Sequence, residues 1–389
     1  MVYLDHAATT PVRAEALADM TEEFGRLGNA SSLHGSGRRA RRVVEEAREA
    51  VADALGATPH EVVFTAGGTE ADNLAVKGLY WARHRADPAR RRVLVGAVEH
   101  HAVLDPAKWT ADHQGAVYEE LPVDRLGRVH PDVLRAAIER DPGGVALVSV
   151  MWANNEVGTV QPVAELAAVA REYGIPLHTD AVQAVGVEPV DFAATGAAAL
   201  TVSGHKLGGP VGAGALLLAR GVDPVPVLHG GGQEREVRSG TLAVPLLRGF
   251  ATAVRLAVAE RAGHAARLAG LRDGLEAAVR AAVPDVVVNG DPEHRLPGIS
   301  HLSFPGCEGD ALLMLLDARG IECSTGSACS AGVARASHVL LAMGADPDTA
   351  RSSLRFSLGR GSTDGDAAAL GEAIGPAVAR ARAARERRR

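Results

Sequence analysis

Short apolar runs alternate with longer segments of helical periodicity up to about residue 219. The runs have the length and the flanking turn residues of buried strands. Six of them lie at 61–64, 92–97, 144–151, 175–180, 198–203 and 212–219. The segment 36–56 is the clearest helix, because Val44, Ala47, Val51 and Leu55 form one apolar stripe. Strands that alternate with helices predict an α/β fold with a mainly parallel sheet.

The pattern changes near residue 250. Residues 250–282 have the composition of one long Ala/Leu/Arg helix, and a helical pattern returns at 309–319. Between and after them lie the short strand-like runs DVVVNG, HLSFPG and SSLRFSLGR, and the small-residue loop STGSACSAG. We therefore expect a large domain over 15–250. A smaller α+β domain, which carries the loop, is expected to consist of 1–14 and 251–389.

The composition of the chain argues against several classes of function. The chain has 389 residues and a formal charge of −6, so it has no overall basic field for direct nucleic-acid binding. Its three cysteines predict neither a disulfide framework nor a zinc site. No uncharged apolar run approaches the ~20 residues that span a membrane, and no signal peptide is evident at the start. We expect a cytoplasmic protein with no membrane partner.

Polar residues follow strand after strand. In open α/β sheets, ligands bind beyond the carboxyl ends of the strands. The polar residues at these positions are Gly68 and Thr69, His100, Asn155, Asp180 and Gln183, and then Ser203, His205 and Lys206. Each alone has an ordinary explanation, since paired glycines are usually turns, asparagines form turns and lysines are usually solvated. Their joint placement predicts one binding site.

One ligand accounts for the whole set. It needs an anionic end for the Gly68–Thr69 turn, Ser203 and His205, a cationic ring atom for Asp180, and an aldehyde for Lys206. Pyridoxal 5′-phosphate has all three, and a lysine with an acidic partner is typical of its sites. The alternative, a nucleotide site, needs a fingerprint such as GxGxxG after the first strand, which TAGGTEADN does not supply.

These motifs also resemble a known family. DHAATTP, GGTEADN, EHHAVLD, NNEVGTVQP, HTDAVQAVG, SGHKLGGPVGAG, RSGTLAVP, STGSACSAG and SSLRFSLGR occur in the order seen in cysteine desulfurases of the NifS/IscS type. Those enzymes are fold-type I pyridoxal-phosphate-dependent transferases of the class V aminotransferase group. The resemblance spans residues 2 to about 362, and implies conversion of L-cysteine to L-alanine.

The resemblance implies roles for individual positions. Lys206 would hold the cofactor aldehyde covalently, Asp180 would pair with the ring nitrogen, and Gln183 would bind the ring oxygen. His100 would stack on the ring and shuttle protons. The phosphate would be held by Gly68, Thr69, Ser203 and His205, with Thr241 from the neighbouring subunit of a homodimer. Asn155 and Arg355 would bind the substrate, and Asn155 would also contact the cofactor.

The same resemblance makes Cys329 the sulfur acceptor, which would carry a persulfide. Its loop of Ser, Gly and Ala suits a thiol that must serve both the substrate and an outside acceptor. The acceptor would be a protein such as an iron–sulfur scaffold or a tRNA-thiolation enzyme. No resident metal is expected, although Cys329 could transiently ligate a cluster with a partner. We interpret Cys307 and Cys323 as structural.

Three other functions stay open from the sequence. A selenocysteine lyase or another sulfur lyase could use the same scaffold and cofactor. A plain aminotransferase could too, but it would have no use for the cysteine loop. An iron–sulfur scaffold without enzymatic activity is disfavoured, because clusters usually take four cysteines and this chain has three.

Overall fold

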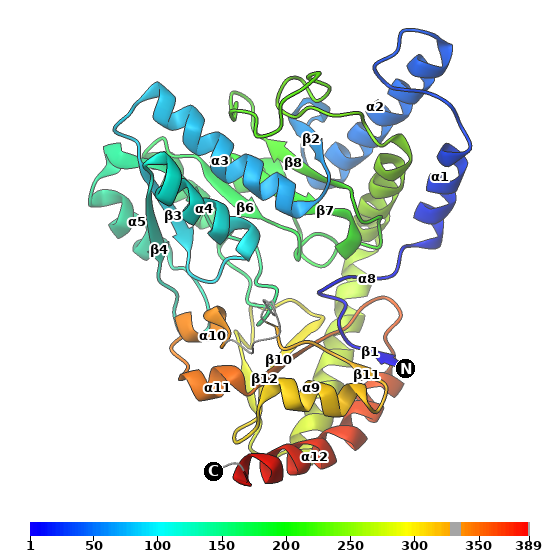
Figure 1. Ribbon diagram of the computed structural model, residues 1–389, viewed down its shortest axis with the longest axis vertical. Coiled ribbons are helices and arrows are strands. Elements are labelled where there is room, and N and C mark those ends of the chain that lie inside the picture. The colour runs from blue at the N-terminus through cyan, green and yellow to red at the C-terminus, as the bar shows by residue number, and fades with distance from the viewer. Residues whose placement is uncertain (327–335, 388–389) are drawn as a thin grey trace.

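The computed structural model describes residues 1–326 and 336–387, so Cys329 lies outside the described residues. The molecule has two parts, each built on its own sheet (Figure 1). We call them the large-sheet part and the small-sheet part. One long helix, α8 (Val244–Ala282), runs from one part into the other.

The large sheet has seven strands in the order β2-β8-β7-β6-β5-β3-β4. All neighbours pair in parallel except β8, which is antiparallel to both β2 and β7. The strands are β2 (Val62–Thr65), β3 (Arg92–Gly96), β4 (Val117–Leu121), β5 (Val145–Ser149), β6 (Leu177–Asp180), β7 (Ala199–Ser203) and β8 (Gly214–Leu218). The predicted mainly parallel α/β sheet is therefore confirmed.

Helices cover both faces of this sheet. α3 (Gly68–Ala86) and α4 (His101–Gln114) bury their apolar residues against one face. The opposite face is covered by α2 (Gly35–Leu55), α5 (Pro131–Glu139), α6 (Val163–Glu172) and the first half of α8. The remaining elements of this part are α1 (Ala14–Phe24), α7 (Phe192–Thr195), and the 3₁₀ turns η1 (Pro59–Glu61), η2 (Pro142–Gly144) and η3 (Gly204–Lys206).

The small-sheet part has a separate core. Its three antiparallel strands lie in the order β12-β10-β9, and a second pair joins β1 and β11 in parallel. The second half of α8 packs here with α9 and α12 around Phe304 and Phe356. The elements are β1 (Val2–Tyr3), β9 (Val287–Asn289), β10 (Ile299–Ser303), α9 (Gly309–Asp317), β11 (Ile321–Glu322), α10 (His338–Ala342), α11 (Pro347–Arg351), β12 (Ser353–Ser357) and α12 (Asp364–Glu386).

The start of the chain connects the two parts. β1 pairs with β11 of the small-sheet part, and Asp5 forms a bridge with Ser357. A few residues later, the Thr10 amide donates to the His205 carbonyl in the large-sheet part (3.2 Å). We call residues 5–10 the crossing segment. Its position between the two sheets brings it to the candidate site.

No helix within 1–326 or 336–387 combines the length and the apolar character that a membrane crossing requires.

Candidate active site

A pocket of about 420 Å³ opens where the large sheet meets the small-sheet part. It lies at the carboxyl ends of β6 and β7, as expected for an open α/β sheet. Every predicted site residue that the structure describes lines it, except Thr241. The predicted residues in its wall are Gly68, Thr69, His100, Asn155, Asp180, Gln183, Ser203, His205, Lys206 and Arg355.

Lys206 ends the short turn η3, directly after β7. Its Nζ donates hydrogen bonds to the carbonyl oxygens of Ala7 and Ala8, the latter at 2.7 Å. Burial and then the charge of Arg355 lower the pKa of Lys206 to about 8. At neutral pH an amine with a pKa near 8 is neutral far more often than an ordinary lysine, so this Nζ is suited to attack a carbonyl.

Asp180 is the last residue of β6 and is only 7% exposed. Burial raises its pKa to about 6, although the Val182 amide (2.8 Å) and the charge of Lys206 act in the opposite direction. Two further carboxyls, Asp72 and Glu99, are buried nearby, and burial raises the pKa of both. A buried carboxylate in such a setting calls for a cationic partner.

The start of α3 gives its end of the pocket the features of an anion-binding site. Gly68 begins the 19-residue helix α3, whose first amides point out of the helix end. A Cβ added to Gly68 would lie 3.1 Å from the Val182 side chain, so glycine lets the turn pack closely. Ser203 and His205, at the end of β7, line the same pocket as Thr69.

His100 is the N-cap of α4, and its Nδ1 accepts the Ala102 amide at 3.1 Å. The ring opens onto the pocket, yet desolvation by the surrounding protein and the charge of Lys206 lower the pKa of His100 to about 4. The ring is therefore neutral at pH 7. Because Nδ1 accepts, the proton of the neutral ring is on Nε2. His100 thus offers an N–H donor.

Arg355 comes from β12 in the small-sheet part and is 4% exposed. Its guanidinium donates to the Asn155 carbonyl (2.9 Å) and to Asp5 Oδ1 (2.6 Å). The Nε of Arg355 is buried without a partner among the described residues. A planar donor group with bonds left to make can bind a carboxylate.

The sequence did not single out several residues that the structure brings to the pocket. These are Ala7 and Ala8, which accept hydrogen bonds from Lys206, Asp5, which pairs with Arg355, and the lining residues Asp72 and His338. The DHAATTP motif contains Asp5, Ala7 and Ala8, so the sequence did carry a signal for these three residues. His338 gave none, because a histidine at the start of a helix carries no local signature.

Thr241 is exposed in the loop before α8 and does not line the pocket. Cys329 is outside the described residues. Cys307 is buried and Cys323 half-buried, and neither is in a disulfide. Burial raises the pKa of Cys323 to about 12 and also that of Cys307, so both thiols are poor nucleophiles.

Comparisons with known proteins agree with this geometry. Residues 2–370 match the family described as "Aminotransferase class-V". An IscS-like cysteine desulfurase of Mycobacterium tuberculosis is 58% identical over 99% of this chain and 98% of its own. The cysteine desulfurase NifS of Azotobacter vinelandii is 40% identical over 98% and 93%.

Solved structures give the same result. A NifS-like protein aligns with a TM-score of 0.89 at 34% identity, over 97% of this chain and 99% of its own. The structure described as SspA in complex with cysteine aligns with a TM-score of 0.79 at 32% identity, over 92% and 99%. Site geometry, sequence and fold converge on one assignment. The chain belongs to the aminotransferase class-V family, among the cysteine desulfurases of the NifS/IscS type.

Proposed function

We propose that this cysteine desulfurase uses the pocket between β6, β7 and β12 to bind pyridoxal 5′-phosphate and L-cysteine. The observation that carries the proposal is the convergence of three groups on one pocket: the amine of Lys206, the buried carboxyl of Asp180 and the guanidinium of Arg355. The products are L-alanine and sulfur, which passes first to Cys329 as a persulfide.

The residues present fit the cofactor. Asp180 is buried, and among the described residues it pairs with no cation at salt-bridge distance, so it suits a protonated ring nitrogen. The start of α3 with Thr69, Ser203 and His205 suits the phosphate, and Lys206 suits the aldehyde. When bound, this cofactor supplies an electron sink for negative charge on the substrate α-carbon.

The protein's own groups then move the protons. Lys206, as a neutral amine, would remove the proton from the substrate α-carbon and later return a proton to the substrate. Asp180 would keep the ring nitrogen protonated during this transfer. His100 would face the ring and offer its Nε2 donor, and Gln183 would bind the ring oxygen. The low pKa of Lys206 suits a base that works near neutral pH.

Arg355 and Asn155 hold the substrate. Arg355 binds the carboxylate of L-cysteine through two parallel hydrogen bonds, and gives up its contact with Asp5 to do so. Asn155 already accepts a bond from Arg355 through its carbonyl, so it also fixes the direction of the guanidinium. This grip orients the α-carbon toward Lys206.

Cys329 carries out the sulfur step. Its thiolate attacks the substrate sulfur, an S–S bond forms, and the carbon–sulfur bond breaks with its electron pair left on the carbon fragment. That fragment takes up a proton and leaves as alanine. The persulfide then passes its sulfur to an acceptor protein, for which an iron–sulfur scaffold and a tRNA-thiolation enzyme are the two candidates.

The assembly belongs to the same proposal. Two copies would form a homodimer in which Thr241 of each chain reaches the phosphate held by its neighbour. The exposure of Thr241, outside its own pocket, supports this arrangement. We also propose a large domain over 15–250, a small domain over 1–14 and 251–389, and a cytoplasmic location.

Replacing Cys329 tests the proposal. Cys329→Ala should still change its cofactor absorbance when L-cysteine is added, because binding and proton transfer precede the sulfur step. It should release no sulfide in the presence of a reductant. Cys323→Ala is the matched control and should keep its activity. Full sulfide release by Cys329→Ala would remove this residue from the reaction.

A further inference from the structure

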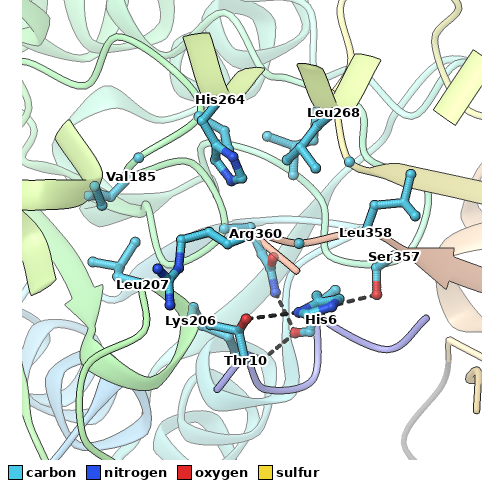
Figure 2. A pocket seen from close by; sticks show the side chains of 18 of the residues that line it. His6, Thr10, Val185, Lys206, Leu207, His264, Leu268, Ser357, Leu358 and Arg360 are labelled. Carbon is cyan, nitrogen blue, oxygen red and sulfur yellow. Dashed lines mark hydrogen bonds between the residues drawn. The ribbon is translucent and has the colours of Figure 1, made fainter. Parts of the chain in front are cut away.

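A second cavity lies behind the crossing segment, on the side away from the first pocket. Its volume is about 90 Å³, enough for several water molecules. Lys206, Ala7 and Gln183 line both spaces, so the crossing segment and Lys206 form a shared wall. Figure 2 shows this cavity, with His6 and Thr10 on one side and His264 on the other. The proposed function assigns it no role.

The polar groups in this cavity are nearly all hydrogen-bond donors or cations. They come from distant parts of the chain: His6, Thr10 and Arg13 from its start, His264 from the middle of α8, and Arg360 from the turn after β12. The Nδ1 of His6 lies 2.8 Å from Thr10 Oγ1. Arg360 extends across the cavity toward Lys206 (Figure 2).

Positive charge in the cavity exceeds negative charge. Arg13 is 2% exposed and bonds to Glu260 (2.8 Å) and to the Leu207 carbonyl (3.1 Å). Arg360 is exposed to solvent, and its guanidinium lines the open side of the cavity without a hydrogen bond or ion pair to any residue in the described ranges. Burial and the charge of Arg13 lower the pKa of Arg360, whereas Glu260 and Glu15 raise it. The lining of the cavity therefore has two guanidiniums and the amine of Lys206, whereas Glu260, which pairs with Arg13, is not part of the lining.

Apolar residues in the cavity wall strengthen the electrostatic attraction of its cations for an anion. Leu207, Leu268 and Leu358 supply this apolar surface, and charges interact more strongly beside a low-dielectric wall than they do in water. A Cβ on Gly359 would lie 2.2 Å from Nδ1 of His6, so glycine at this position lets the His6 ring lie against the backbone. Burial lowers the pKa of His6 to about 4 and lowers that of His264. Both rings are thus neutral at pH 7 and add no charge, but each carries an N–H donor.

We propose that this cavity binds a small oxyanion, either a tetrahedral ion such as inorganic phosphate or a carboxylate, held mainly by Arg360 and Arg13. Both classes present the paired oxygens that guanidinium groups bind. The site would be distinct from the phosphate end of the cofactor pocket, which lies at the start of α3.

The crossing segment connects this cavity to Lys206. The crossing segment turns His6 and Thr10 toward the cavity, while its Ala7 and Ala8 carbonyls accept hydrogen bonds from Lys206. The Ala7 carbonyl also accepts a bond from Gln183 (2.9 Å). An anion that draws His6 and Arg360 together would act on the backbone that positions the catalytic lysine.

Inorganic phosphate is the probe, and the cofactor-loaded enzyme is the sample, because the phosphate end of the first pocket is then filled. Titration calorimetry should detect one saturable phosphate site per chain. Arg360→Gln should weaken this binding about ten-fold or more, the factor expected for a lost hydrogen bond to a charged group. Arg360→Lys should retain more affinity than Arg360→Gln, because it keeps the charge.

Two further variants complete the design. Arg380→Gln removes an exposed arginine from α12 and should leave phosphate binding unchanged. His264→Gln changes the opposite wall and should weaken binding about three-fold, so the proposal does not depend on one variant alone. Competition by acetate would assign the site to carboxylates, and its absence would assign the site to tetrahedral ions.

Absence of saturable phosphate and acetate binding would overturn the proposal. Equal phosphate affinity of Arg360→Gln and the unmodified enzyme, both folded by their melting temperatures, would also overturn it. The measurement involves no turnover, so either outcome leaves the desulfurase assignment untouched.

Discussion

The two halves of the active-site pocket hold their charges differently. On the large-sheet side, Asp180 and Lys206 are fixed at strand ends and have no ion-pair partner among the described residues. On the small-sheet side, Arg355 is already engaged by Asp5 at 2.6 Å. In the proposed function, the first half suits a cofactor that stays bound, because its charged groups have no ion-pair partner in the described part of the protein. The second half suits a substrate that binds and leaves, because Asp5 pairs with the guanidinium when the substrate is absent.

Lys206→Ala should have the largest effect on the cofactor half. Loss of the amine removes both the covalent attachment and the base, so activity should fall by about 10⁴-fold or more. The chain has three lysines, and Lys108→Ala, half exposed on α4, is the matched control. Borohydride trapping followed by peptide mass spectrometry should place the cofactor on Lys206. A label on Lys77 or Lys108 would contradict the assignment.

Asp180→Asn should have the next largest effect. The amide cannot keep the ring nitrogen protonated, so the rate constant kcat should fall by about 10²-fold or more while the cofactor stays bound. Absorbance and alanine production separate the two properties. Asp223→Asn, at an exposed position after β8, is the control. A kcat within a few-fold of the unmodified enzyme would mean that Asp180 does not support the reaction.

Arg355→Gln tests the substrate half. Loss of the charged hydrogen bonds should raise KM for L-cysteine by about 10- to 100-fold, with a smaller change in kcat. Asp5→Asn should leave KM unchanged or lower it by a few-fold, since it frees Arg355, and should reduce the free energy of unfolding by about 1–3 kcal/mol. If Asp5→Asn raised KM as much as Arg355→Gln, the exchange between Asp5 and substrate would be wrong.

The pH dependence of cofactor loading gives the smallest and most specific test. Only the neutral amine attacks an aldehyde, and the pKa of Lys206 is lowered to about 8. The rate of cofactor uptake by the cofactor-free protein should therefore rise about ten-fold per pH unit below pH 8 and level off above it. Stopped-flow absorbance measures this rate. A rise that continued to pH 10 would show an ordinary lysine.

Much of the large sheet could be predicted, because its strands are continuous apolar runs. The run at 144–151 contains β5 (Val145–Ser149), and the run at 198–203 contains β7. β4 was missed, because VYEEL is an edge strand with exposed and half-exposed positions and has no apolar run. Likewise, α8 begins at Val244 rather than 250, because its first turn contains Pro245 and has the sequence character of a loop.

The residues of the candidate site also differ in how far the sequence could predict them. Residues at strand ends could be predicted, because parallel strands bring their carboxyl ends to one edge. Arg355 lies in the middle of β12 and was identified only through the family resemblance. The Asp5–Arg355 pair could not be foreseen, since it joins residues 350 positions apart through the packing of two sheets.

Helix α8 sets a limit on how this fold can vary. It is a single 39-residue rod that packs on both cores, with Phe250 in one and Leu275 in the other. Each residue inserted into a helix turns everything beyond it by about 100° and advances it by about 1.5 Å. Descendants of this sequence can lengthen or shorten surface loops freely, but a single added codon within the rod would swing Arg355 out of line with Lys206.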